Sequence, residues 1–258
     1  MAEVKDSGIL IQDVETKNIM TKSTLPVGGY SVNPYVGCTH SCKYCYASFM
    51  KRFTGHTEPW GTFLDVKHWP AIKNPQKYKG QRVVIGSVTD GYLPQEAQFQ
   101  NTRKLLEQLR GSEAEILICT KSDLVIRDID LLKELGKVTI SWSINTLDED
   151  FKNDMDNGIT DFEAIFHQVR NQCDLIWLEN LNLRGGFKKD ILDYIRKKYP
   201  DLVPLYDAIY NKRDRSYFRG LEDQAERLAK ENSCPFVDNE LPYGRAEPGH
   251  PVIVDYFY

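Results

Sequence analysis

The chain has 258 residues, of which 41% are hydrophobic and 27% charged, an ordinary globular balance that excludes wholesale disorder. Its net charge of −4 excludes a global basic field that would drive non-specific binding to nucleic acid or anionic membranes. The longest apolar runs are strand-sized, so no membrane span is expected, and the N-terminal residues are too polar for a signal peptide. We therefore expect a cytoplasmic protein.

Residues 1–29 are polar and predict an N-terminal extension. A short strand is predicted over 30–36, a short helix over 46–52, and a long irregular connection over 54–80. From residue 82, β-branched runs alternate with amphipathic helical patterns, and we expect these as strands 82–88, 115–120, 138–144 and 174–179 and helices 95–110, 128–135, 161–170 and 188–198. This alternation predicts a parallel sheet covered by helices, with a ligand site at the carboxyl ends of the strands.

Two further segments follow, a predicted amphipathic helix over 218–231 and an apolar, strand-like run over 251–258. The alternation is interrupted once, because residues 145–157 lead directly into the helical pattern that begins near residue 160. A βα repeat needs roughly 30 residues. We therefore expect that one βα unit is missing between residues 157 and 158, either through true loss or because a stretch of the protein is omitted there.

Six cysteines are present, and three of them crowd into one loop with the spacing C-x-x-x-C-x-x-C: Cys38, Cys42 and Cys45. Three thiolates can bind three irons of a cubane cluster and leave the fourth iron open to a small molecule, since such a cluster usually takes four cysteines. An adventitious zinc site or three core cysteines are the alternatives. Of the other cysteines, Cys119 and Cys173 border strand-like runs, which favours core positions.

The segment NPYVGCTHSCKYCYA (residues 33–47) resembles the radical S-adenosylmethionine (SAM) superfamily, whose signature has this spacing with an aromatic residue before the third cysteine. The resemblance extends to the spore photoproduct lyase-like branch, and within it to the mobile-pair radical SAM proteins, through GSVTD, ICTKSD and SWSINT. It implies a partial (β/α)6 TIM-like barrel over residues 30–258. It also implies a 4Fe–4S cluster that cleaves SAM to a 5′-deoxyadenosyl radical, which takes hydrogen from an unknown substrate.

The resemblance implies roles for particular residues. Cys38, Cys42 and Cys45 would hold the cluster, and Tyr46 would lie beside the adenosine. The SAM contacts would come from three predicted strand ends: Thr89 and Asp90, Lys121, and Ser143 with Asn145. Each has a plainer alternative, namely a helix cap for Asp90, a solvated loop lysine for Lys121 and a strand-end turn for Ser143 and Asn145.

The resemblance also implies partners. An electron donor of the flavodoxin or ferredoxin type is expected, and a non-catalytic iron–sulfur or zinc module is the rival function. DNA lesion repair of the spore photoproduct lyase type is an alternative substrate class, but residues 81–94 lack the cysteine that returns a hydrogen atom in that enzyme. The tract YNKRDRSYFRG (210–220) mixes cations with aromatics and could contact nucleic acid, or it could be a solvated loop.

Overall fold

The computed structural model describes residues 3–5, 8–23, 29–143, 176–177, 183, 185–232 and 236–237. The chain divides into two units, residues 1–160 and 161–258, each of which is described by itself. Several sequence predictions lie outside the described residues: the helix over 161–170, the run over 251–258, the SAM contact at Asn145, and the missing unit between residues 157 and 158.

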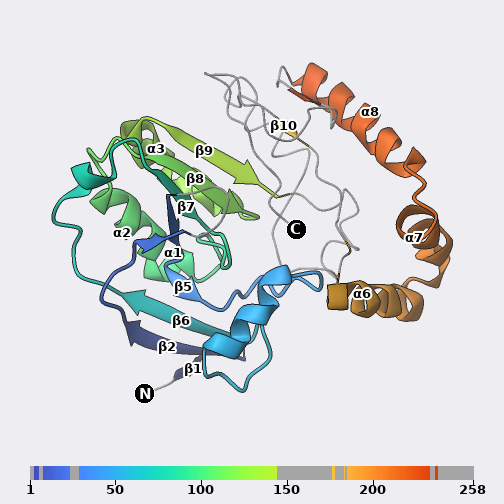
Figure 1. Cartoon of the computed structure of the whole chain (residues 1–258), viewed down its shortest axis with the longest axis horizontal. Coiled ribbons are helices and arrows are strands. Elements are labelled where there is room, and N and C mark those ends of the chain that lie inside the picture. The colour runs from blue at the N-terminus through green and yellow to red at the C-terminus, as the bar shows by residue number, and fades with distance from the viewer. Residues whose placement is uncertain are drawn as a thin grey trace. The chain divides into compact units, whose positions relative to one another are not determined.

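The first unit contains a five-stranded sheet (Figure 1) with the order β3 (Thr21–Lys22), β4 (Tyr30–Val32), β7 (Arg82–Ile85), β8 (Glu115–Thr120) and β9 (Val138–Trp142). Strand β3 is antiparallel to β4, whereas β4, β7, β8 and β9 are parallel. The predicted parallel α/β architecture is therefore confirmed. Among the described strands this sheet is open and does not close into a barrel.

A second sheet of the first unit has the order β1 (Glu3–Lys5), β2 (Ile9–Glu15), β6 (Phe63–His68) and β5 (Tyr35–Val36). Strands β2 and β6 pair in parallel from Leu10 opposite Phe63 to Glu15 opposite His68. The prediction of an irregular connection over 54–80 is thus wrong in its middle. The first four residues of β6 are all buried, so the strand lacks the polar alternation by which a half-exposed strand is recognised.

Helices α2 (Asn101–Gln108) and α3 (Ile129–Leu135) cover one face of the five-stranded sheet (Figure 1). Their buried leucines pack with the buried side chains of β7 and β8 in one core. Burying each such side chain stabilises the fold by about 1.5–3 kcal/mol. In β8, Ile116, Ile118 and Thr120 are buried on this side, while Leu117 and Cys119 alternate with them and are only half-buried. Cys119 therefore does not belong to the buried core.

Local backbone features explain why several predicted boundaries are wrong. The predicted strand over 82–88 ends at Ile85, because Gly86 has a φ of +94° and a Cβ there would lie 2.2 Å from the carbonyl oxygen of Cys119. The predicted helix over 95–110 consists of α1 (Glu96–Phe99) and α2, since Gln100 between them is left-handed. The predicted strand over 30–36 is two strands, β4 and β5, in different sheets.

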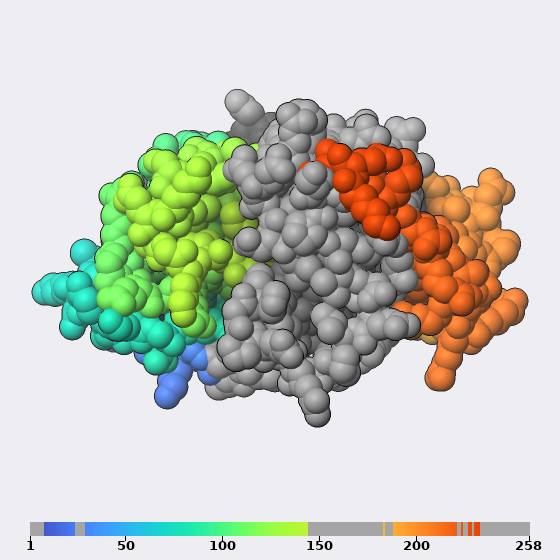
Figure 2. Space-filling model, turned by 90° about the horizontal axis from the view of Figure 1, so that it is seen from above, coloured from blue at the N-terminus to red at the C-terminus, as the bar shows by residue number. Residues whose placement is uncertain are grey.

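Shorter helical segments complete the first unit: η1 (Tyr46–Phe53), η2 (Pro75–Tyr78) and η3 (Asp123–Asp128). The described part of the second unit consists of α6 (Gly185–Lys198), η4 (Pro200–Leu202), α7 (Val203–Tyr210), α8 (Ser216–Glu231) and the parallel strand pair β10 (Ile176–Trp177) and β11 (Phe236–Val237). Figure 2 shows a face of the first unit on which α3 and β9 (yellow-green) are prominent. None of the described helices is both long and apolar enough to cross a membrane.

Candidate functional site

The cysteine loop, residues 37–46, follows β5 directly. Its first residue, Gly37, has a φ of +85°, and a Cβ there would lie 2.4 Å from the carbonyl oxygen of Phe63. Only glycine fits such a close approach to β6 without strain. Within the loop, the backbone N–H of Ser41 donates to the carbonyl of Cys38, and that of Cys45 to the carbonyl of Cys42. These two turns place all three predicted cluster ligands on one short segment.

Burial and nearby N–H groups act in opposite directions on the pKa of two thiols in the cysteine loop. Burial raises the pKa of the Cys45 thiol, while the backbone N–H groups of Ala47 and Ser48 and the indole of Trp60 act in the opposite direction. Burial also raises the pKa of the Cys38 thiol, the Asp90 carboxylate adds to this, and the Asp90 backbone N–H opposes it. Such N–H donors to cysteine sulfur are one of the features that set the potential of iron–sulfur clusters.

The donor set fits a cluster. The charges of Cys42 and Cys45 raise the pKa of the Cys38 thiol, as expected for thiols crowded into one loop. Three neighbouring thiolates repel one another unless metal cations neutralise them. Two buried nitrogens in this region, Nδ1 of His40 and Nε1 of Trp60, meet no acceptor with hydrogen-bond geometry in the described part of the chain, although the indole is close enough to lower the pKa of Cys45. Ligated sulfur or cluster sulfide would offer acceptors there.

No three histidine, cysteine or carboxylate side chains converge on a single ion within the described residues. A cubane cluster does not need such convergence, because each cysteine binds an iron of its own.

Asp90 joins the cysteine loop to the ends of β7 and β8. Its Oδ1 accepts the backbone N–H of Tyr92 at 2.8 Å and the hydroxyl of Thr120 at 2.7 Å, and its Oδ2 accepts the backbone N–H of Lys121 at 2.7 Å. The Nε2 of His40 lies 3.1 Å from the same Oδ2, although it is not aligned as a hydrogen bond. Burial raises the pKa of Asp90, but His40 and these backbone donors outweigh it and hold the pKa below its ordinary value.

We expect Asp90→Asn to destabilise the protein by about 1–3 kcal/mol. The carboxylate accepts hydrogen bonds on both oxygens, whereas an amide has only one acceptor oxygen, so at least one of the present donors would lose its partner. Chemical denaturation of the cluster-free protein measures this directly. Asp123→Asn is the matched control, since Asp123 is exposed and its loss should cost at most about 0.5 kcal/mol. Equal stability of the two variants would contradict the role of Asp90 in tying these elements together.

Thr89 is buried, and its environment is organised by Asn33, which sequence reasoning missed. The Oδ1 of Asn33 accepts the backbone N–H groups of Val88 and Thr89, at 3.2 and 3.3 Å, and its Nδ2 donates to the hydroxyl of Ser87 at 3.2 Å. Asn33 thus holds the loop after β7 beside the strand that leads to the cysteine loop. The signal was present in the sequence, because Asn33 follows β4 at a parallel strand end.

Lys121 and Tyr46 both contact neighbouring elements of the site. The Nζ of Lys121 donates to the hydroxyl of Tyr44 at 2.8 Å and lies 5.1 Å from the centre of its ring. Lys121 is therefore not a fully solvated loop lysine, and its charge lowers the pKa of the Cys45 thiol. The hydroxyl of Tyr46 donates to the backbone carbonyl of Ser87. The structure thus brings Lys121 and Tyr46 to the same edge of the sheet as the cysteine loop.

Ser143 follows β9 at the same edge. It is exposed, and its backbone N–H donates to the carbonyl of Thr120 at 2.8 Å, which continues the β8–β9 pairing. The sequence analysis also missed Trp60 and His40. Both are defined by tertiary contacts that a single sequence does not display.

A family model, the radical SAM superfamily, matches residues 32–176. Among curated proteins, the chain is 29% identical over 239 residues to the uncharacterized protein MJ0683 of Methanocaldococcus jannaschii, with 80% of this chain and 89% of that protein covered. It is also 38% identical over 135 residues to the uncharacterized protein ORF301 of Acidianus two-tailed virus, with 48% of this chain and 44% of that protein covered.

The chain belongs to the radical SAM superfamily, because the family model spans more than half of it and includes the cysteine loop. It is accordingly a radical SAM enzyme, as the sequence predicted. Among solved structures it is similar to a spore photoproduct lyase complexed with dinucleoside spore photoproduct, at 16% identity and a TM-score of 0.45. That match covers 74% of this chain but only 57% of the other chain, and so weak a likeness says nothing about the substrate.

Proposed function

We propose that Cys38, Cys42 and Cys45 hold a 4Fe–4S cluster through which the enzyme cleaves SAM reductively. When bound, such a cluster supplies the electron that breaks the sulfonium of SAM and the open iron that holds its methionyl group. The observation that supports this assignment best is the cysteine loop itself. Its three cysteines lie on one short segment between β5 and η1, and the buried Nδ1 of His40 in the same loop lacks an acceptor among the described residues.

Around this loop the chain's own residues would position SAM. Lys121 would pair with the methionyl carboxylate, since its ammonium lies at the end of β8 and contacts the cysteine loop. Tyr46 would lie against the adenosine, with Thr89, Ser143 and Asn145 as further contacts. Asp90 would accept both ribose hydroxyls only after its neighbours moved, because its Oδ1 already accepts two hydrogen bonds and its Oδ2 accepts one and lies 3.1 Å from His40.

The substrate is unassigned, and one surface feature favours nucleic acid as a candidate. In the tract 210–220, Tyr217 is 44% exposed and the guanidinium of Arg215 lies 5.9 Å from the ring centre of Phe218. Exposed rings beside cations suit stacked bases and phosphates. Against repair of the spore photoproduct lyase type stands the absence of a cysteine from residues 81–94.

Anaerobic reconstitution with iron and sulfide tests the cluster assignment independently of any substrate. We expect about four irons and about four sulfides per chain, with a brown colour that is bleached by dithionite. Analysis of iron, zinc and acid-labile sulfide in the same sample makes the measurement. A colourless protein that retains one zinc ion and no sulfide would support the binding-module alternative instead.

A further inference from the structure

An aromatic and basic surface begins at the last residue of the cysteine loop. Segment η1 starts at Tyr46, directly after Cys45, and exposes three aromatic side chains: Tyr46 (39%), Phe49 (46%) and Phe53 (67%). Large aromatic side chains are normally buried, and exposed clusters of them mark interaction sites. Because a 3₁₀ helix rises about 2 Å per residue, Phe49 lies only about 6 Å along the axis from Tyr46.

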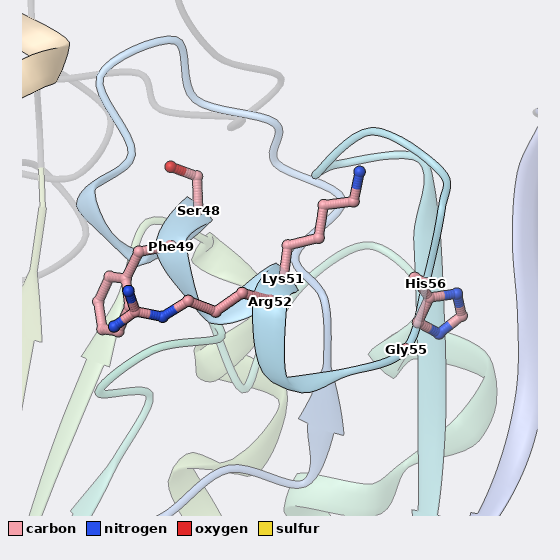
Figure 3. Close-up of a pocket in the computed structure, with 6 residues that line it drawn as sticks. All are labelled: Ser48, Phe49, Lys51, Arg52, Gly55 and His56. Atoms are coloured by element: carbon pink, nitrogen blue, oxygen red, sulfur yellow. The ribbon is translucent and has the colours of Figure 1, made fainter.

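The same surface is positively charged. Residues 41–57 contain Lys43, Lys51 and Arg52 and no carboxylate, in a chain whose net charge is −4. The guanidinium of Arg52 lies 5.3 Å from the ring centre of Phe49 and 4.7 Å from that of Phe53. Arg52 and Phe49 lie together on one side of η1 in Figure 3, and Lys51 points away from them.

Beside η1 is a surface cavity of about 600 Å³ lined by Ser48, Phe49, Lys51, Arg52, Gly55 and His56 (Figure 3). His56, which lines this cavity, is held in place by the second sheet. Its ring stacks on Phe63, and its Nε2 lies 2.8 Å from the Oδ1 of Asp65 in β6. Aromatic and arginine side chains are enriched at protein–protein interfaces and often contribute most of the binding energy.

We propose that the surface of η1 formed by Phe49, Lys51, Arg52 and Phe53 is the docking site of an acidic, low-potential electron carrier protein. The inference rests on the proposed function, because only a cluster-bearing enzyme needs such a partner. Two observations support this kind of partner. Residues 41–57 carry three cations and no carboxylate, although Glu58 follows and lies 3.2 Å from His56. The surface also lies on the segment that begins directly after the predicted cluster ligand Cys45. The cations of the surface attract an acidic carrier, and the position of the surface next to Cys45 brings that carrier close to the cluster.

The electron balance of the step is simple. The reduced carrier would give one electron to the oxidised cluster, so the carrier is oxidised and the cluster is reduced by one electron. No bond forms or breaks at the interface, so the surface needs only to hold the carrier near Cys45. Dithionite can deliver the same electron without docking, which separates docking from the chemistry that follows.

The test compares two reductants in the reconstituted full chain with SAM present. Flavodoxin kept reduced by its NADPH-dependent reductase is the protein donor, and dithionite is the small-molecule donor. We expect Arg52→Glu and Phe53→Ala each to lower the flavodoxin-driven rate of 5′-deoxyadenosine formation about tenfold, with the dithionite-driven rate changed less than about twofold. Lys133→Glu, on the exposed face of α3, reverses a charge elsewhere and should change neither rate.

Calorimetric titration of flavodoxin into the reconstituted chain provides a second readout that needs no turnover. Binding should be about tenfold weaker in Arg52→Glu and should weaken as salt is added. An equal fall of both reductant-driven rates, or unchanged flavodoxin binding in the variants, would overturn the proposal. Competition for this surface by a single-stranded oligonucleotide, lost in the same variants, would reassign it to nucleic acid. A wild-type chain that binds flavodoxin but cleaves no SAM with dithionite would instead refute the proposed function alone.

Discussion

Cys42→Ala is expected to lower the rate of dithionite-driven SAM cleavage by at least about three orders of magnitude, because a cluster that has lost one of three protein ligands is not retained. Cys42 is half-buried in the cysteine loop, and its charge acts on Cys38. The measurement is the yield of 5′-deoxyadenosine per chain after anaerobic reconstitution, together with the iron content of the same sample.

Cys234→Ala is the matched control for this experiment, because it removes a thiol that lies outside the C-x-x-x-C-x-x-C spacing. It should retain both iron and cleavage. Cys42→Ser should behave like Cys42→Ala, since a hydroxyl does not replace a thiolate as an iron ligand. Cleavage that survives in Cys42→Ala with full iron content would show that the ligand set has been assigned wrongly.

Asp128→Ala is expected to lower the free energy of unfolding by about 3 kcal/mol, because it removes a fully buried carboxylate that pairs with two arginines and leaves both of them with fewer hydrogen bonds. Asp128 is fully buried and accepts hydrogen bonds from Arg103 at 2.7 Å and from Arg127 at 2.7 and 2.8 Å. Arg127 also pairs with the buried Glu96 at 2.8 Å, and Glu96 accepts the hydroxyl of Tyr35. Denaturant unfolding of the cluster-free protein measures the loss.

Asp130→Ala tests whether the large loss of stability expected for Asp128→Ala depends on the burial of the carboxylate. Asp130 pairs with the same Arg103 at 3.3 Å, but its side chain is 62% exposed, so its removal should cost less than about 1 kcal/mol. Similar losses in the two variants would contradict the importance of burial in this network.

The same pair of variants gives a pH dependence. Burial raises the pKa of Asp128, but Arg127 and Arg103 outweigh it and hold the pKa below its ordinary value of about 4. A depressed folded-state pKa contributes stability that is complete above that ordinary value and is lost as the pH falls through the folded-state pKa. Asp128→Ala should therefore lose less stability than the wild type on acidification below about pH 4.

Local patterns predicted much of the fold. The β-branched runs at β7, β8 and β9 and the leucine spacing of α2 and α3 each reflect burial on one face, which a sequence displays directly. Strand β6 was missed because it is buried without alternation between two loop-like stretches. Helix α7 was missed although Pro204 stands in its first turn, which is a usual helix start.

The site was predictable as far as its motif extends. The cysteine spacing is a local pattern of the chain, so Cys38, Cys42 and Cys45 could be predicted as cluster ligands from the sequence alone, and this assignment stays a prediction. The resemblance pointed to Thr89 and Lys121, and the rule that parallel strands share an edge is consistent with their place at the ends of β7 and β8. The surroundings of the Asp90 carboxylate could not be predicted, because its three donors come from residues 92, 120 and 121 and His40 lies beside it, and only the tertiary fold brings these residues together.

The central claim is that this chain cleaves SAM through a cluster held by the cysteine loop. The most direct measurement is the formation of 5′-deoxyadenosine and methionine by the anaerobically reconstituted full chain, given SAM and dithionite. We predict equimolar amounts of the two products in the wild type and neither product in Cys42→Ala. A wild-type chain that holds about four irons and about four sulfides, yet leaves SAM intact, would contradict the claim.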